Sequence, residues 1–249
     1  MIEKHLGDTI DIHGGGIDLQ FPHHENELAQ SRCSPEGAPF ANYWLHNGFL
    51  NMNSEKMSKS LGNVLLVHDL IEQAPGEAIR LALLNGHYRQ PLDWNDDVLP
   101  QAKAQLDRLY GALRHLDGVK PASGDHIPAG FLGALLDDLN TPKALAELFQ
   151  LAKLANQAHD PQEKAKLKAA LLQSGLLIGL LQQDANEWFE GADGSSDLDA
   201  DAIEAQIEAR NAARAAKDFA EADRIRDALA DAGVLIEDGP EGTKWKLAG

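Results

Sequence analysis

The sequence predicts an α/β region, followed by an α-helical bundle and a small α+β module. In roughly the first ninety residues, short β-branched runs and glycines alternate with helical segments, which is typical of an α/β arrangement. Leucines then recur at three- and four-residue steps, as on the buried face of a helix. The chain ends with a helical hairpin and two β-rich runs. We therefore divide it into 1–96, 97–190, a linker at 191–198, and 199–249.

Within the α/β region, residues 9–13 alternate between apolar and polar side chains and stop at three glycines, so we predict a strand that ends in a loop. Pro22 suits the first turn of a helix, which we predict over about 22–33. A buried strand over 42–50 and a polar loop over 54–63 follow. Two short helices complete the region, and the second carries a run of apolar residues: Ala78, Ile79, Leu81, Ala82 and Leu83.

Four helices are predicted in the bundle. The apolar face of the first is marked by Leu106, Leu109, Leu113 and Leu116. After a loop over 118–128, a second helix covers about 129–138. Thr141 is the predicted cap of a third helix, and a fourth helix covers 161–182. Short loops between these helices indicate antiparallel neighbours.

The C-terminal module is predicted to contain two helices and two strands. The helices cover 199–216 and 218–232, and Gly233 is the predicted C-cap of the second. The runs 234–238 and 243–246 are separated by Gly-Pro-Glu-Gly, which predicts strand, turn and strand.

Charge and cysteine content exclude several function classes. The chain has 249 residues and a formal net charge of −17, which argues against sequence-blind attraction to nucleic acid or anionic lipid. Its one cysteine, Cys33, excludes an intramolecular disulfide and indicates a reducing compartment. No apolar run reaches the length of a membrane span. We expect a cytoplasmic protein without membrane association, and a monomer.

The densest polar cluster is His-His-Glu-Asn-Glu at 23–27. On a helix, His23 and Glu27 lie one turn apart on the same face, where an imidazole and a carboxylate can converge on one cation. Both groups are good zinc ligands, although a tetrahedral site needs further ligands from elsewhere. The residues alone leave one alternative open, in which these polar side chains are solvated at the capped start of a helix.

A second cluster, His-Gly-Gly-Gly-Ile-Asp at 13–18, begins at the end of the first predicted strand. Glycines let the backbone approach a ligand closely, and a nearby acid such as Asp18 can accept ribose hydroxyls. The spacing is not that of the dinucleotide-binding pattern G-x-G-x-x-G. A tight loop without any ligand explains the glycines equally well.

A third cluster, which we call the lysine loop, covers 55–63 and contains Lys56 and Lys59 with serines beside them. Two ammonium groups on a mobile loop can neutralise the charge that grows on a pyrophosphate leaving group. Lysine interacts with phosphate as a point charge and does not depend on a bidentate hydrogen-bond geometry. The loop can therefore move during a reaction without losing the interaction. The alternative is a solvated surface turn.

Several of these segments resemble one enzyme family. Residues 56–60, Lys-Met-Ser-Lys-Ser, are identical to the KMSKS signature of class I aminoacyl-tRNA synthetases. The stretch 11–27 resembles the cysteinyl-tRNA synthetase version of the catalytic domain, and 137–142, Asp-Asp-Leu-Asn-Thr-Pro, resembles the helical-domain signature of that family. The segment from Ala222 to Trp245 resembles its C-terminal module. The resemblance therefore covers essentially the whole chain.

The resemblance implies a two-step reaction. Cysteine reacts with ATP, bound with magnesium, to give cysteinyl-adenylate and pyrophosphate, and cysteine then passes to the terminal adenosine of tRNA(Cys). In this family the catalytic domain is a Rossmann-like α/β domain and the helical bundle is a tRNA-binding domain. The C-terminal module is implied to recognise the anticodon.

The resemblance also implies roles for single residues. Zinc is expected at His23 and Glu27 with the substrate thiolate as a further ligand, because zinc takes a soft thiolate more readily than a serine hydroxyl. Lys59, supported by Lys56, is expected to stabilise the ATP phosphates in the transition state. His13 is expected to contact the aminoacyl or adenylate part. The nucleoside is expected to meet three residues: Gly15, Gly16 and Asp18.

Family members begin with a strand, a HIGH-type loop and a long insertion, and this sequence contains none of them. Two cysteine ligands of the implied zinc site are also missing from it. We therefore expect the C-terminal portion of a cysteinyl-tRNA synthetase, which alone neither activates cysteine nor binds zinc tightly. Missing parallel strands should leave 1–90 poorly stable, whereas 97–182 should resist proteolysis.

Two other functions stay open. A cysteine ligase of the mycothiol pathway resembles the family in its zinc and KMSKS-type loops but joins cysteine to an amino-sugar, which does not require the bundle and the C-terminal module. A non-catalytic RNA-binding or assembly protein would use Arg224, Arg226 and Lys244, with a base stacked on Trp245. The alternative for this last set is a solvated face with a packed tryptophan.

Overall fold

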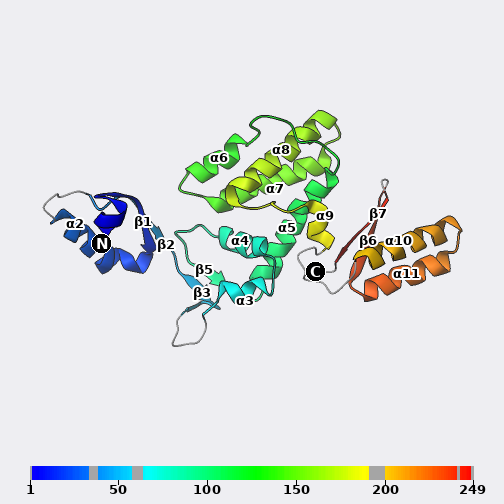
Figure 1. Ribbon diagram of the computed structural model, residues 1–249, viewed down its shortest axis with the longest axis horizontal. Coiled ribbons are helices and arrows are strands. Elements are labelled where there is room, and N and C mark those ends of the chain that lie inside the picture. Colours follow the sequence, from blue (N-terminus) through cyan, green and yellow to red (C-terminus); the bar gives the residue numbers. More distant parts are fainter. Residues whose placement is uncertain (1, 34–38, 58–63, 191–199, 240–241, 248–249) are drawn as a thin grey trace. The chain divides into compact units, whose positions relative to one another are not determined.

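The computed structural model describes residues 2–33, 39–57, 64–190, 200–239 and 242–247. Within these ranges helices predominate and three small sheets are present (Figure 1).

The chain divides into two compact units. Unit 1 comprises Met1–Leu106 and Asp125–Leu151, and unit 2 comprises Asp107–Gly124 and Ala152–Gly249.

The first sheet, in unit 1, pairs β1 (Ile10–Gly16) with β2 (Ala41–Asn47) in parallel, after a short helix α1 (Ile2–Leu6). In this register His13 lies opposite Trp44. The strand predicted at the start of the chain is confirmed, and the sheet places a histidine next to an aromatic side chain.

Two details of this sheet differ from the prediction. The glycines at 14–16 belong to β1 and do not form a loop, because their extended backbone pairs with residues 45–47 of β2. The second strand is also less buried than predicted, since Tyr43 is 68% exposed.

The connection between these strands consists of a 3-10 turn η1 (Ile17–Leu19), a π-type turn η2 (Gln20–His24) and the helix α2 (Glu25–Arg32). The predicted single helix over 22–33 is therefore shorter than expected. Phe21 has an extended backbone (φ −137°, ψ 132°), so regular helix begins only at Glu25.

The second sheet has the strand order β4-β3-β5. β3 (Leu50–Met52) pairs antiparallel with β4 (Glu55–Lys56) and parallel with β5 (Leu92–Trp94). β4 lies inside the predicted polar loop. β5 was not predicted, because three residues are too few to reveal an alternating pattern.

Two helices, α3 (Val67–Ile71) and α4 (Gly76–Leu84), lie between β4 and β5 in the chain, as predicted. Most of the predicted apolar run in α4 is buried: Ala78, Ile79, Leu81 and Ala82. Leu83 is 48% exposed, because each residue of a helix is rotated by about 100° from the one before it.

The helical region contains α5 (Val98–His115), α6 (Ala129–Leu136), α7 (Thr141–Gln157), α8 (Pro161–Ile178) and α9 (Ala185–Glu190). The first four correspond to predicted helices, and α9 was not predicted. Among the described residues, none of the helices is both long and apolar enough to cross a membrane.

The predicted apolar face is confirmed by the burial of Leu106, Leu109 and Leu113 in α5 and of Leu116 directly after it. The predicted cap of α7 is wrong by one residue. Asn140 Oδ1 accepts a hydrogen bond from the Lys143 N–H (3.2 Å), whereas the Thr141 hydroxyl donates to the Gly86 carbonyl (3.4 Å). Asn140 therefore caps the helix, and Thr141 links it to the end of α4.

The C-terminal module consists of α10 (Ala200–Ala215), α11 (Phe219–Asp231) and the antiparallel pair β6 (Val234–Gly239) and β7 (Gly242–Leu247). This agrees with the predicted hairpin of helices and the strand, turn and strand. Gly233 has φ 82°, as expected for a glycine after a helix. The predicted linker at 191–198 lies outside the described residues.

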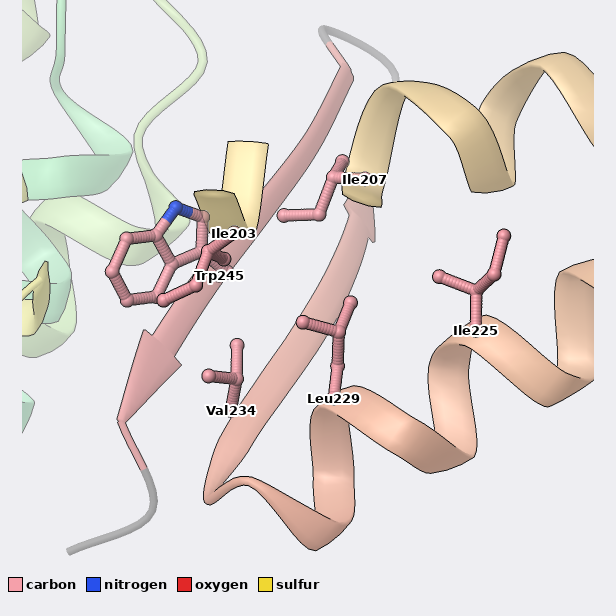
Figure 2. Close-up of a cluster of buried hydrophobic side chains, with 6 residues drawn as sticks. All are labelled: Ile203, Ile207, Ile225, Leu229, Val234 and Trp245. Atoms are coloured by element: carbon pink, nitrogen blue, oxygen red, sulfur yellow. The ribbon is translucent and has the colours of Figure 1, made fainter. Parts of the chain in front are cut away.

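Both helices and both strands contribute to one apolar core in this module. Figure 2 shows its six side chains: Ile203, Ile207, Ile225, Leu229, Val234 and Trp245.

Candidate active site

His24 lies directly against β1 because Gly15 has no side chain. A Cβ atom at Gly15 would stand 2.9 Å from Cε1 and 3.0 Å from Nε2 of the His24 ring. His24 ends η2 and is only 4% exposed. The glycine in the strand thus allows an imidazole to be buried on the backbone of β1.

Three side chains with metal-binding atoms meet at this point, and we call them the histidine–glutamate cluster: His13, His24 and Glu27. One ligand atom from each lies within 4.8 Å of the others. His13 Nε2 is 3.0 Å from Glu27 Oε2, yet both atoms are buried without a well-aligned hydrogen bond within the described residues. Buried polar atoms of this kind indicate a place for an ion or ligand.

Aromatic rings enclose the cluster. The centroid of the His13 ring lies 5.1 Å from that of Phe40 and 5.0 Å from that of Trp44, both in edge-on arrangements. The His24 and Trp44 centroids are 5.4 Å apart. An apolar surround strengthens the interaction of an ion with its ligands, because it lowers the local dielectric constant.

The surroundings of His24 favour its neutral form. Burial is the main cause that lowers the pKa of His24 below 6.5, and the neighbouring His13 and His46 lower it further. His24 Nδ1 lies 2.8 Å from His46 Nε2, a hydrogen bond that fixes the orientation of the ring. A neutral, oriented imidazole is the form that binds a metal ion.

The predicted zinc pair overlaps with this cluster. His23 Nε2 lies 3.6 Å from Glu27 Oε1, so the side chains one turn apart do converge. The His23 side chain is 61% exposed. Imidazole nitrogens and carboxylate oxygens are zinc ligands, and the cluster therefore fits zinc chemically.

Sequence reasoning did not predict that His13 and His24 would lie beside Glu27. His13 comes from β1 and His24 from the turn before α2, and only the packing of that turn on Gly15 brings them together. The spacing of residues along the chain carries no signal for such a contact.

The three residues expected at the nucleoside lie at the end of β1. Gly15 and Gly16 are its last two residues, and Asp18 is in η1. A Cβ atom at Gly16 would lie 2.5 Å from Asp18 Oδ1, so this carboxylate folds back over the glycine backbone. Contact of these residues with a nucleoside stays a prediction.

The lysine loop is described only where it starts. Glu55 and Lys56 form β4, and their backbones pair with Met52 and Asn51. Lys59 lies outside the described residues. The phosphate-binding role of Lys56 and Lys59 stays a prediction.

The acidic residue Asp138 of the helical-domain signature joins two segments of unit 1. Asp138 accepts hydrogen bonds from the Tyr88 hydroxyl (2.7 Å) and from Arg89 Nε and Nη2 (2.6 and 2.9 Å). The hydrogen bonds from Arg89 and Tyr88 lower the pKa of Asp138 from 3.8 to about 2. This residue holds the turn before α7 on the segment after α4.

The cations expected to bind RNA are paired with acids in the described structure. Arg224 Nη2 is 2.7 Å from Glu221, Arg226 lies 3.1 Å from Asp223 and 3.0 Å from Asp227, and Lys244 Nζ is 3.6 Å from Asp117. The surface around them is therefore not a patch of free positive charge.

Two further basic residues of this module have a structural role. Arg210 donates to both carboxylate oxygens of Asp238 (2.9 and 2.8 Å), and Arg214 adds a third hydrogen bond (2.8 Å). The Arg210 bonds hold the pKa of Asp238 well below its usual range. These contacts tie the end of β6 to α10.

The expected stacking of a base on Trp245 is wrong for this structure. Trp245 is only 4% exposed and belongs to the apolar core of the module. Its ring therefore has no open face on which a base could stack. Burial of a large indole contributes strongly to the stability of so small a core.

Comparison with known proteins identifies the class of protein to which the chain is similar. Residues 1–104 match the family model "tRNA synthetases class I (C) catalytic domain", residues 130–182 match the DALR domain, and residues 196–245 match the "Cysteinyl-tRNA ligase anticodon binding domain". The fold is also similar to a solved leucyl-tRNA synthetase–tRNA complex from Agrobacterium radiobacter K84. The TM-score is 0.55 at 18% identity, covering 72% of this chain and 27% of that one. The three matched domains and their order are those of a class I aminoacyl-tRNA synthetase.

Two curated relatives show which family within this class the chain matches. The chain is 68% identical over 249 residues to a cysteine–tRNA ligase of Parvibaculum lavamentivorans, covering 100% of this chain and 53% of the relative. It is 57% identical to a cysteine–tRNA ligase of Xanthomonas campestris pv. campestris, with the same coverage. The chain belongs to the cysteine–tRNA ligase family, as the signature segments predict, and it spans about half the length of these curated relatives.

Proposed function

We propose that this chain is part of a ligase that activates cysteine with ATP and transfers it to tRNA(Cys). In the first step the cysteine carboxylate attacks the α-phosphate of ATP and pyrophosphate leaves. In the second step a ribose hydroxyl of the terminal adenosine of tRNA attacks the acyl carbon and AMP leaves. The observation that carries this proposal is the 68% identity to a cysteine–tRNA ligase along all 249 residues.

Zinc is the proposed metal ion of the site. Glu27 and His23 would hold it with the substrate thiolate as a further ligand, and His13 and His24 would line the site beside Glu27. Zinc bound there would supply a soft Lewis acid that prefers a thiolate to a hydroxyl, which selects cysteine over serine without a difference in pocket size. The buried atoms His13 Nε2 and Glu27 Oε2, which lack well-aligned hydrogen bonds in the described structure, support this assignment.

ATP, with magnesium, is the proposed second substrate. Lys59 and Lys56 would neutralise charge on the leaving pyrophosphate, since ammonium groups interact strongly with phosphate oxygens. His13 would face the aminoacyl or adenylate part, while Gly15, Gly16 and Asp18 would face the nucleoside. Gly15 and Gly16 end β1, Asp18 follows directly, and His13 lies in the middle of the same strand, which supports this arrangement.

tRNA is the proposed acceptor, in preference to an amino-sugar. The match of residues 196–245 to an anticodon-binding domain supports this choice, because a small acceptor has no anticodon. Arg224, Arg226 and Lys244 would then contact RNA after exchanging their acidic partners for phosphates. A cytoplasmic monomer is the form we propose for this activity.

The proposed function is tested by cysteine-dependent exchange of pyrophosphate into ATP. The assay is run on the 249-residue chain and on the chain extended to the full length of its relatives. We expect exchange with cysteine but not with serine in the extended protein, and none in the chain alone.

A matched pair of variants tests the metal site in the same assay. Glu27→Gln should lower the exchange rate at least about tenfold, whereas Glu25→Gln, which changes an exposed acid two residues away, should leave it unchanged. Equal exchange with serine, or an unaffected Glu27→Gln variant, would show the proposal to be wrong.

A further inference from the structure

The turn that leads into the lysine loop is tightly constrained. Asn53 and Ser54 connect β3 to β4, and both have positive φ values, 49° and 67°. A two-residue turn with both residues in the left-handed region is the hairpin connection whose twist matches the flanking strands. Asparagine tolerates this conformation well, but serine is strained in it. The turn therefore needs support from outside the hairpin.

That support comes from β5. Asp93 Oδ1 accepts a hydrogen bond from the Ser54 N–H at 2.6 Å, and Asp93 Oδ2 accepts one from the Ser54 hydroxyl at 3.3 Å. The neighbouring Asn53 N–H donates to the Trp94 carbonyl at 3.0 Å. Two consecutive residues of β5 thus bond to both residues of the turn.

β5 is a rigid base for this contact. It pairs in parallel with β3 (Figure 1). In this register Asn51 lies opposite Asp93 and Met52 lies opposite Trp94. Trp94 is only 4% exposed. β4 itself is only two residues long, and its pairing with β3 is limited to Asn51–Lys56 and Met52–Glu55. So short a strand takes its direction from the turn that precedes it.

We propose that Asp93 is a positioning residue for the start of the lysine loop: its carboxylate fixes the turn at Asn53 and Ser54 and so sets the direction in which the backbone of β4 runs along the edge of the sheet to Lys56. Asp93 lies 37 residues after Lys56 in the chain and has no role in the reaction described above. The relevance of this contact to catalysis rests on the proposed phosphate role of the loop, but the anchoring itself can be measured separately.

The anchoring is tested by hydrogen exchange and proteolysis on the 249-residue chain. In Asp93→Ala, exchange of the Ser54 amide and trypsin cleavage after Lys56 should each become about fivefold faster or more, because a charge-assisted hydrogen bond is lost from the turn. Exchange in α4 and cleavage after Lys164 in α8 should not change. Asp93→Asn, which retains an acceptor oxygen for the Ser54 N–H, should restore most of the wild-type behaviour.

Two controls make the result specific. Asp96→Ala removes an exposed acid near β5 and should have no effect on the turn. Ser54→Gly relieves the strain of a positive φ, so Asp93→Ala should have a smaller effect in that background. Wild-type exchange and cleavage in Asp93→Ala, or failure of Asp93→Asn to restore them, would overturn the proposal.

Magnesium–ATP, added to the chain extended to the full length of its relatives, separates this inference from the proposed function. If the loop binds phosphate, the nucleotide should slow cleavage after Lys56 in the wild type and do so less in Asp93→Ala. Absence of protection in the wild type would overturn the phosphate role of the loop, while the exchange and cleavage results without nucleotide still decide whether Asp93 anchors the turn.

Discussion

Glu27 belongs both to the predicted zinc pair and to the cluster found in the structure, and the imidazoles around it differ in burial. The His23 side chain is 61% exposed, whereas His24 is 4% exposed and held by Gly15 and His46. An exposed imidazole has to be ordered when an ion binds, but a buried one is already in place. A substitution at His23 therefore removes a proposed zinc ligand with little loss of packing, while one at His24 removes a packed side chain.

The charge of Asp138 is tied to the folded state, because the hydrogen bonds from Arg89 and Tyr88 lower the pKa of its carboxyl to about 2. Because folding lowers this pKa from 3.8, the ionised carboxylate is favoured in the folded chain, and its contribution is fully present above that value. The contribution is lost as the pH falls from 3.8 through 2. Asp138→Asn should therefore lower the free energy of unfolding at neutral pH, and the difference from the wild type should shrink in acid. Urea unfolding at several pH values measures this.

Asn is a suitable replacement at this position because Asp138 has φ 56°, which asparagine tolerates. Asp137→Asn, at the exposed neighbouring residue, serves as the control and should differ little from the wild type at any pH. A difference between wild type and Asp138→Asn that stays constant down to about pH 2 would contradict the role of the Arg89 and Tyr88 contacts.

At the scale of the element, β1 depends on one glycine for its contact with the turn before α2. Gly15→Ala would place a Cβ atom within 3.0 Å of the His24 ring, which is buried and hydrogen-bonded and cannot move aside easily. We expect a loss of about 1–3 kcal/mol in the free energy of unfolding, as for other overpacked sites. Denaturant unfolding of the chain measures it.

Gly14→Ala is the matched control, in the same strand. Its Cβ atom would lie 3.6 Å from the Leu45 carbonyl oxygen, an ordinary contact distance. The change in the free energy of unfolding should stay within about 0.5 kcal/mol. Equal effects of the two substitutions would mean that the approach of His24 is not what requires glycine.

Helices in which apolar residues repeat over several turns were predicted best. The leucines of α5 repeat over three turns, and their burial is confirmed. β5 was missed, since three residues show no periodicity, and α9 was missed because it has only six residues. The glycines of β1 were predicted as a loop, because a run of glycines gives no side-chain pattern and only its pairing with β2 makes it a strand.

At the scale of the whole molecule, the C-terminal module carries its own core. All six buried apolar side chains of this core come from residues 203–245 (Figure 2). The isolated fragment 199–249 should therefore fold, with a marginal stability of no more than about 3–5 kcal/mol. Trp245 is its one tryptophan, so its fluorescence should be blue-shifted and should shift to the red cooperatively in urea.

Two leucines distinguish a packed core from loose helices in this fragment. Leu229 is 2% exposed and Leu235 is 42% exposed. Leu229→Ala should cost about 2–5 kcal/mol and unfold the fragment, whereas Leu235→Ala should have a small effect. Tryptophan emission that is the same with and without urea, or equal effects of the two substitutions, would show that the fragment has no such core.

The sequence by itself determined the family, the order of the helices and the types of side chain at the candidate site, because these depend on motifs and on patterns that are local in the chain. The tertiary structure alone decided which side chains meet. His13 joins His24 and Glu27 because a turn packs on Gly15, Asp93 reaches Ser54 because β5 pairs with β3, and Trp245 is buried because two helices and two strands close around it. Such contacts join residues that are distant in sequence, and their free energy comes from packing and hydrogen bonds that form only when the chain is folded.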